Sequence, residues 1–268
     1  MKNNKELQEE LLSFQTLWKG GFCEGDPKNP FFGLYGIHSF MGVSHAIYLA
    51  CIKPFIKPTT TVLEIGCGRG AWTKLILEAN AIYCLDALSA KHNGFNDYVG
   101  IHKHVHYYQV QDFSMNMISD NSIDYVFSYD ALCHVSYEGI QEYARNMYNK
   151  MKTGAIGFWM IADYEKYNNF VKNIDKPNLL HSLIPGNKKH KIIRFILKNL
   201  FHQINIHEKK KYQLTILDVN EDNIPRPGRW YNVGGNKLVN LLKQIGYEII
   251  SEDMELDFRS PIIYFKKP

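Results

Sequence analysis

The residues best suited to chemistry gather around a glycine-rich stretch, VLEIGCGRG, at residues 62–70. Gly66, Gly68 and Gly70 follow a short apolar run, and glycine allows the main chain to approach a bound molecule closely. A helix that begins after such a turn would present free N–H groups to that molecule. Asp86 follows about 20 residues later, where a carboxylate can accept hydrogen bonds from both hydroxyls of a ribose. This spacing predicts a site for a cofactor that contains a nucleoside.

Glu64 helps to decide between two such cofactors. The glycines alone leave both open, because Gly66, Gly68 and Ala71 also fit a variant of the dinucleotide-binding pattern. Glu64 lies at the end of the apolar run, where a carboxylate would repel the pyrophosphate of a nicotinamide dinucleotide. The same carboxylate could orient the cationic amino-acid end of S-adenosylmethionine. Glu64 therefore favours S-adenosylmethionine.

Two later apolar runs also end in polar residues. In VQDFS, residues 110–114, Asp112 is well placed to accept a hydrogen bond from the amine of an adenine. FSYDALCHV, residues 127–135, ends the following run, at the point in the chain order where open α/β sheets bind ligands. We therefore expect both runs to contribute to one site.

Asp130 and His134 are the candidate bases for an alcohol acceptor. Their i, i+4 spacing at the start of a predicted helix would place them on one face. His134 titrates near neutrality and so suits the removal of a proton, although it could instead only pack the turn. Asp130 could act as the base or contact the substrate. Asp163 and Tyr164, after the next predicted strand, are further candidates.

Apolar runs alternate with amphipathic segments from residue 59 to residue 164, which is typical of a doubly wound, mostly parallel α/β sheet. The runs predict strands at residues 62–65, 81–85, 106–110, 123–128 and 155–161. Helices are predicted at residues 71–79 and 140–151, the second ended by Lys152, Thr153 and Gly154. A helix at 237–245 precedes two strands at 247–251 and 261–265, whose short connection makes them antiparallel neighbours.

We interpret the chain as one domain with four stretches. Residues 1–58 form a helical lead-in, with amphipathic helices at 6–14 and 40–55, and residues 59–164 form the cofactor-binding core. Residues 165–230 interrupt the alternation, include a basic amphipathic helix at 192–200, and are expected to cover the substrate as a lid. Residues 231–268 return to the core as a helix and a strand pair.

Four motifs in this order resemble the class I S-adenosylmethionine-dependent methyltransferases: VLEIGCGRG, CLDAL at residues 84–88, VQDFS and FSYDALCHV. The resemblance covers residues 60–162 and 235–266. It implies a Rossmann-like sheet of seven strands with an antiparallel last strand. WKGGF and EGDP, within residues 18–27, and GRGAWT, residues 68–73, are similar to bacterial O-methyltransferases of surface-sugar and capsule pathways. That similarity implies O-methylation of a small hydroxylated sugar or polysaccharide precursor, with S-adenosylhomocysteine as the second product.

The resemblance also implies cofactor contacts in all four motifs. These are Glu64, Gly66, Gly68 and Gly70 at the methionine end, Asp86 at the ribose, Ala87, Leu88, Asp112 and Phe113 around the adenine, and Ser128 and Tyr129 near the sulfonium. Asp130 and His134 remain the candidate catalytic residues.

The net charge of +4 over 268 residues is unevenly distributed. Residues 188–211 hold eight Lys or Arg and one acid, so the rest of the chain is acidic overall. This basic segment could contact an anionic substrate, form a solvated lid or a face of a homodimer, or bind RNA or a membrane surface. We expect no membrane span, because no apolar run approaches about 18 residues. The start lacks the shape of a secretory signal, and five cysteines without a CxxC pair are expected to be reduced, which predicts a cytoplasmic protein.

A metal is not expected, although two patterns are compatible with one. His102, His104 and His106 would share one face of an extended segment, where they form either a metal pattern or a polar surface. Magnesium held by Asp130 or Asp163 is the other alternative.

Three other functions remain open: an RNA methyltransferase, an NAD(P)-dependent reductase and a non-catalytic cofactor-binding module. Nucleic acid is not expected as the partner, because residues 128–131, SYDA, lack the Asn/Asp-Pro-Pro-aromatic motif that base-amine methylases of this fold usually carry there.

Overall fold

The computed structural model describes residues 4–17, 42–173, 216–220 and 230–268. Two compact units divide the chain: Met1–Asp163 with Glu221–Pro268, and Tyr164–Asn220. The interpretation as one domain with a lid at 165–230 stays a prediction. The motifs at residues 18–27 and the basic helix at 192–200 lie outside the described residues.

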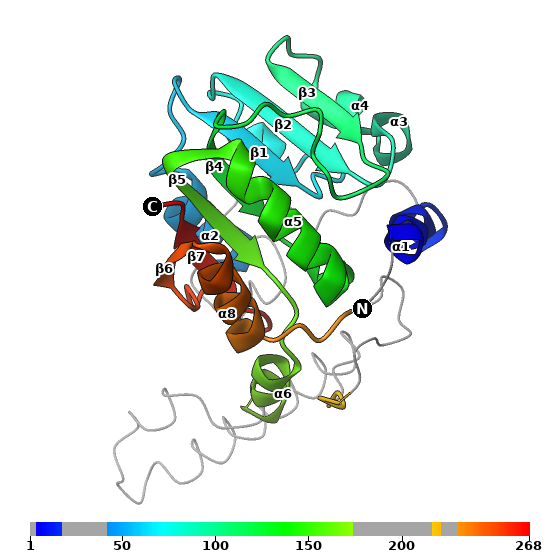
Figure 1. Ribbon diagram of the computed structural model, residues 1–268, viewed down its shortest axis with the longest axis vertical. Helices are drawn as coiled ribbons and strands as arrows, with labels where there is room; N and C mark the ends of the chain where they lie inside the picture. Colours follow the sequence, from blue (N-terminus) through cyan, green and yellow to red (C-terminus); the bar gives the residue numbers. More distant parts are fainter. Residues whose placement is uncertain (1–3, 18–41, 174–215, 221–229) are drawn as a thin grey trace, which may run out of the picture. The chain divides into compact units, whose positions relative to one another are not determined.

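Seven strands of the first unit form one mixed sheet in the order β3-β2-β1-β4-β5-β7-β6 (Figure 1). The pairs from β3 to β5 are parallel, whereas β7 is antiparallel to both β5 and β6. The predicted Rossmann-like fold with its antiparallel ending is therefore confirmed. The strands are β1 Thr61–Ile65, β2 Ala81–Asp86, β3 Val105–Gln109, β4 Ile123–Ser128, β5 Met151–Met160, β6 Glu248–Ser251 and β7 Ile262–Lys266.

The central strands are apolar because the sheet is covered on its faces. Leu63 in β1 and Val126 in β4 are fully buried, as expected of parallel strands that are buried on both sides. On one face, α5 (Tyr137–Lys150) and α8 (Gly235–Ile245) lie side by side (Figure 1). Each helix buries an apolar stripe, represented by Met147 in α5 and Leu242 in α8.

The helix α1, Asn4–Leu17, confirms the amphipathic lead-in helix that was predicted at residues 6–14. The other described helices of the first unit are short: α2 Val43–Ile47, the π-helix η1 Tyr48–Ile52, α3 Ala90–Asn93, α4 Phe95–Val99 and the 3-10 turns η2 Thr73–Leu75 and η3 Leu132–His134. Within the described residues, no helix is long and apolar enough to cross a membrane. Cys51, Cys67, Cys84 and Cys133 are buried and form no disulfide within the described residues.

The predicted α-helix at residues 71–79 is wrong. Only the 3-10 turn η2 forms there, and the amide of Ile76 donates to the carbonyl of Thr73 in the tighter i to i−3 pattern. Thr73 is fully buried, and its hydroxyl donates to Glu64 at 2.6 Å. This hydrogen bond to the strand below holds Thr73 in a position that favours the tighter turn over a regular α-helix. The spacing of apolar residues could not indicate such a contact.

The predicted end of the helix at 140–151 is also wrong. α5 ends at Lys150, and Met151 is already extended and opens β5 opposite Ile123 of β4. Lys152, Thr153 and Gly154 therefore belong to the strand. Gly154 adopts a φ of 83° within the stretch where the register between β4 and β5 shifts.

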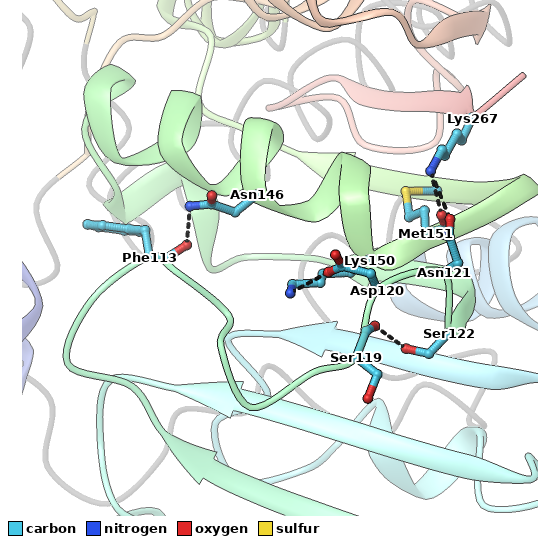
Figure 2. Close-up of polar contacts among 9 residues, drawn as sticks. All are labelled: Phe113, Ser119, Asp120, Asn121, Ser122, Asn146, Lys150, Met151 and Lys267. Atoms are coloured by element: carbon cyan, nitrogen blue, oxygen red, sulfur yellow. Dashed lines mark hydrogen bonds and ion pairs between the residues drawn. The ribbon is translucent and has the colours of Figure 1, made fainter.

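The connection from β3 to β4 has no regular helix and is held by polar contacts with its neighbours (Figure 2). Asn146 of α5 donates to the carbonyl of Phe113 at 2.9 Å, and Lys150 forms a 2.7 Å ion pair with Asp120. Lys267, after β7, donates to the side-chain oxygen of Asn121 in the loop at 3.4 Å and to the carbonyl of Met151 at 2.8 Å. These contacts fix the loop that carries Asp112.

The second unit contributes one described helix, α6 Tyr164–Asn173. Asn168 of α6 is buried and bonds to Leu217 in both directions: its amide nitrogen donates to the Leu217 carbonyl at 2.7 Å, and its oxygen accepts from the Leu217 amide at 2.8 Å. The Asn168 side chain thus satisfies both main-chain hydrogen-bonding groups of Leu217, as the main chain of a neighbouring strand does in a sheet.

A buried carboxylate joins α1 to the start of α5. Glu10 is only 4% exposed, and its two oxygens accept from the amide and the hydroxyl of Ser136, each at 2.7 Å. Ser136 is the N-cap of α5, where the main chain offers unpaired N–H groups and a positive dipole. Glu10 thereby ties the N-terminal helix to the turn that carries His134.

Replacing Glu10 by glutamine should lower the free energy of unfolding by about 1.5–3 kcal/mol, because one buried donor would then face an amide NH₂ group. Urea denaturation followed by circular dichroism measures this change. Glu9→Gln is the matched control, because Glu9 lies on the same helix with a side chain 63% exposed. Equal urea midpoints for the two variants would contradict a stabilising role of Glu10.

Candidate active site

The glycine-rich turn after β1 requires glycine at its first and last positions. Gly66, Gly68 and Gly70 have φ angles of 73°, 52° and 94°, in the left-handed region that other residues rarely adopt. A Cβ atom on Gly66 would lie 2.1 Å from the Cβ of Ala131, and one on Gly70 would lie 2.2 Å from Val99. The turn therefore lies directly against the end of β4, beside Asp130.

Asp86 ends β2 and fixes the glycine-rich turn from the side. One carboxylate oxygen accepts from the amide of Gly68 and the other from the amide of Leu88, each at 2.8 Å. Burial raises the pKa of Asp86, and these two hydrogen bonds oppose that shift. A carboxylate has about four lone-pair positions, so Asp86 keeps some acceptor capacity for a ribose hydroxyl beside these two amides and the Asn93 side chain.

Glu64 lies beneath the turn rather than on its surface. It is 2% exposed and accepts from the hydroxyl of Thr73 at 2.6 Å, while the Cys84 thiol lies 4.0 Å away. Burial raises the pKa of Glu64 to about 8; the Thr73 hydrogen bond lowers it, and the nearby Asp86 adds to the rise. Near pH 7 the carboxyl group is therefore largely protonated until a cation approaches.

Binding of S-adenosylhomocysteine at pH 7 should release a large fraction of one proton if the ligand's ammonium group lies beside Glu64. The positive charge would lower a pKa of about 8 to below 7, so the bound state would hold fewer protons than the free state. Calorimetry in two buffers of different ionisation enthalpy measures the release. Glu64→Gln should show none, and the absence of release from the native protein would remove Glu64 from the methionine end.

Ser128 and Tyr129, at the end of β4, both use their hydroxyl groups within the protein. Ser128 is 1% exposed and donates to the carbonyl of Ile65 at 2.9 Å, which joins the tips of β4 and β1. Tyr129 donates to Asp257 at 2.8 Å, and its ring meets Trp72 edge-on. The main chain of these residues therefore lies at the turn, while their hydroxyls have partners elsewhere.

The residues expected around the adenine divide into exposed and buried ones. Asp112 is exposed and accepts from the amide of Ser114 at 2.9 Å. Phe113 is buried and packs edge-on against Tyr143 of α5. Leu88 is buried and Ala87 is half-buried beside the end of β2. Asp112 is thus exposed to an approaching ligand, whereas Phe113 is fixed by the core.

Asp130 and His134 do approach each other, but not on a helix face as predicted. Asp130 has a φ of 56°, and the chain continues as the 3-10 turn η3 rather than as an α-helix. The helical expectation is wrong because α5 begins only after the Ser136 cap. The side chains nevertheless converge: one polar atom each from Asp130, Cys133 and His134 lies within 4.8 Å of the others. His134 is 7% exposed.

Two residues that sequence reasoning missed, Asp257 and Arg259, complete this region. Arg259 donates to Asp130 at 3.2 Å, lies 3.8 Å from Asp257, and stacks over the ring of Trp230 at 4.9 Å. Asp257 also accepts from the amide of Arg259 at 2.8 Å and from Tyr129. The antiparallel entry of β7, with Ile262 paired to Met160 at the end of β5, brings this segment to the site.

The other candidate residues have different partners. His102 and His104 each direct Nε2 towards a main-chain carbonyl, those of Val99 and Leu77, at 3.1 and 3.0 Å. His106 stacks on Tyr83 of β2. Asp163 accepts from the amide of Gly235 at 2.8 Å, at the start of α8. These histidines and Asp163 thus each have a structural contact of their own.

The residues present fit a nucleoside cofactor with a cationic amino-acid end. The left-handed turn admits no side chain at Gly66 or Gly70, because Ala131 and Val99 fill the space beside them, so glycine there sets the tight shape of the turn. Asp86 has acceptor capacity left for a ribose hydroxyl, and Glu64 is a buried acid that a cation would stabilise in its charged form. A pyrophosphate in the place of the cation would leave Glu64 in its neutral, protonated form, so the buried acid would supply no complementary charge.

Comparisons with known proteins agree with this fit. Residues 62–154 match a family described as a methyltransferase domain. No curated protein is similar enough in sequence to count as a match. The fold is similar to two solved structures described as S-adenosylmethionine-dependent methyltransferases. One, from Listeria monocytogenes, is 17% identical with a TM-score of 0.51, covering 84% of this chain and 98% of that one. The other, from Mesorhizobium loti, is 14% identical with a TM-score of 0.51, covering 84% and 100%.

A third similar structure, the PH0226 protein from Pyrococcus horikoshii, is 14% identical with a TM-score of 0.52, covering 84% of this chain and 88% of that one. At these identities the structures show a shared fold, and the family match adds the activity. Residues 62–154 therefore match a methyltransferase domain within a class I fold, and the protein is an enzyme that uses S-adenosylmethionine as its methyl donor.

Proposed function

We propose that the enzyme methylates an oxygen of a small hydroxylated acceptor, and that this acceptor is a sugar or surface-polysaccharide precursor. The observation that carries the proposal is the convergence of Asp130 and His134 at the carboxyl end of β4, with polar atoms within 4.8 Å. A hydroxyl group must lose a proton when it is methylated, and a carboxylate and an imidazole are the side chains suited to remove it. The sugar assignment is supported by the similarity of residues 68–73 to capsule O-methyltransferases.

The proposal assigns the cofactor contacts to the carboxyl ends of β1, β2 and β4. When bound, S-adenosylmethionine supplies a methyl group carried on a positively charged sulfur. Glu64, below the turn, compensates the positive charge of the cofactor's amino-acid end. Gly66, Gly68 and Gly70 form the turn against which that end of the cofactor lies. Asp86 holds the ribose hydroxyls. The adenine lies between Ala87, Leu88, Asp112 and Phe113, and the main chain of Ser128 and Tyr129 borders the sulfonium.

The acceptor would lie against Asp130 and His134. His134 takes the hydroxyl proton on an imidazole nitrogen, which raises the nucleophilicity of the oxygen. Asp130 orients the acceptor or the imidazole by accepting a hydrogen bond. Both side chains are held largely out of solvent, with Asp130 19% exposed, so the arrangement also limits competition from water.

The alternatives predict different partners. The methyltransferase match disfavours a nicotinamide-dependent reductase. RNA methylation remains an alternative acceptor class. An anionic acceptor and a homodimer were expected from the basic segment at 188–211, which lies outside the described residues and leaves both as predictions.

An acceptor screen with native enzyme and S-adenosylmethionine tests the proposal. Nucleotide sugars, free sugars, catechols, amines and total RNA are compared by the rate at which S-adenosylhomocysteine forms. Turnover with a hydroxylated sugar, and loss of that turnover when the target hydroxyl is replaced by hydrogen, would support the proposal. Turnover only with amines or RNA would overturn it.

A further inference from the structure

Arg259 lies at the centre of the acceptor region and is almost fully enclosed. Its side chain is 9% exposed, and its guanidinium lies 3.2 Å from Asp130 and 3.8 Å from Asp257. The Trp230 ring covers one face of the guanidinium at 4.9 Å. Two carboxylates therefore share one fixed positive charge.

The same region contains the elements of a metal site. Asp130, Cys133 and His134 each offer one ligand atom, and these atoms lie within 4.8 Å of one another. A carboxylate, a thiolate and an imidazole form a three-ligand set that suits Zn²⁺ or Co²⁺. Cys133 is fully buried, and its thiol lies 3.7 Å from the Asp130 oxygen that also accepts from Arg259.

We propose that Arg259 is the resident cation of this site: it positions Asp130 and, through Asp257, Tyr129, and it excludes a divalent metal ion from Asp130, Cys133 and His134. A divalent ion bound to Asp130 would lie beside the guanidinium, and like charges a few ångströms apart in a poorly solvated region repel strongly. The planar guanidinium also serves two carboxylates at once and is always charged. Arg259 thus supplies the positive charge that a metal would otherwise bring, without depending on a diffusible ion.

Cobalt titration tests this proposal without any methyl acceptor. Co²⁺ bound by Cys133 gives a thiolate-to-cobalt absorption band, so binding is seen directly at pH 7.5. We expect the native protein and Arg259→Lys, which keeps a positive charge, to show no band. Arg259→Gln should bind Co²⁺ at least about 100-fold more tightly than the native protein. Adding Cys133→Ser to Arg259→Gln should abolish the band and identify the site.

A native protein that binds Co²⁺ through Cys133 as tightly as Arg259→Gln would overturn the proposal, as would a folded Arg259→Gln variant that binds none. If that variant does not fold, Asp257→Asn combined with Arg259→Gln takes its place, because it removes one buried negative charge together with the positive one and keeps all three ligands. The inference about Arg259 rests on the proposed function only in that the methyl acceptor is placed beside Asp130 and His134. Failure of the acceptor screen would leave the cobalt result unchanged, so the two failures are distinguishable.

Discussion

Asp86→Asn is expected to weaken the binding of S-adenosylhomocysteine by at least about 2 kcal/mol, or roughly 30-fold, as measured by calorimetry. The variant loses a charged acceptor for the ribose hydroxyls. It also places an amide NH₂ group against the N–H of either Gly68 or Leu88, which now donate to the two carboxylate oxygens at 2.8 Å. Asp97→Asn is the control, because Asp97 is an exposed acid on α4.

A second ligand separates the two effects of the Asp86 change. An S-adenosylhomocysteine analogue without the 2′ and 3′ hydroxyls should bind the native protein more weakly than the parent ligand, and this difference should shrink towards zero in Asp86→Asn. If the variant kept the full preference for the hydroxyl-bearing ligand, Asp86 would act only through the turn. The ribose assignment would then be wrong.

The strands were predictable because burial alone specifies them. The runs at 62–65, 81–85 and 123–128 lie in the middle of the sheet, where both faces are covered, and all three form strands at nearly those bounds. The seven-stranded sheet with its antiparallel ending was implied by the family resemblance, and the short connection between the last two strands made them antiparallel neighbours. For these elements local sequence and global packing favour the same structure.

The segment after the glycine-rich turn shows why local periodicity failed. Residues 71–79 have helical spacing, but Thr73 is drawn inward by the carboxyl group of Glu64. A hydrogen bond between a turn and the strand beneath it does not alter the spacing of apolar residues, so that spacing cannot predict it. The same holds for Asp130 and His134, which meet through a left-handed residue and a 3-10 turn rather than through a shared helix face.

Only part of the candidate site could be predicted from the sequence. The motifs at the ends of β1, β2 and β4 are local and could be recognised, whereas Asp257 meets Tyr129 across 128 residues of chain. A physical signal did exist: an antiparallel last strand must begin at the edge where the parallel strands end. Polar residues just before β7, such as Asp257 and Arg259, are therefore expected at the ligand-binding edge of any sheet with this order.

His134→Ala is expected to lower the turnover of a hydroxylated acceptor about 100-fold or more, while the calorimetric affinity for S-adenosylhomocysteine stays unchanged. The imidazole is 7% exposed beside Asp130, and its loss removes the proposed proton acceptor. Because the cofactor contacts lie on other residues, a merely structural defect would lower both quantities. His102→Ala is the control, since His102 contacts the carbonyl of Val99, away from the site.

Comparison with Asp130→Asn decides which of the two side chains is the base. If His134 takes the proton, the loss of turnover in His134→Ala should be partly rescued by added imidazole, which can occupy the space left by the side chain, whereas Asp130→Asn should not respond. Near-normal turnover in His134→Ala together with a large loss in Asp130→Asn would assign the base to Asp130. That outcome would place the proton on a carboxylate that already accepts a hydrogen bond from Arg259 at 3.2 Å, whereas rescue by imidazole would assign the proton to His134.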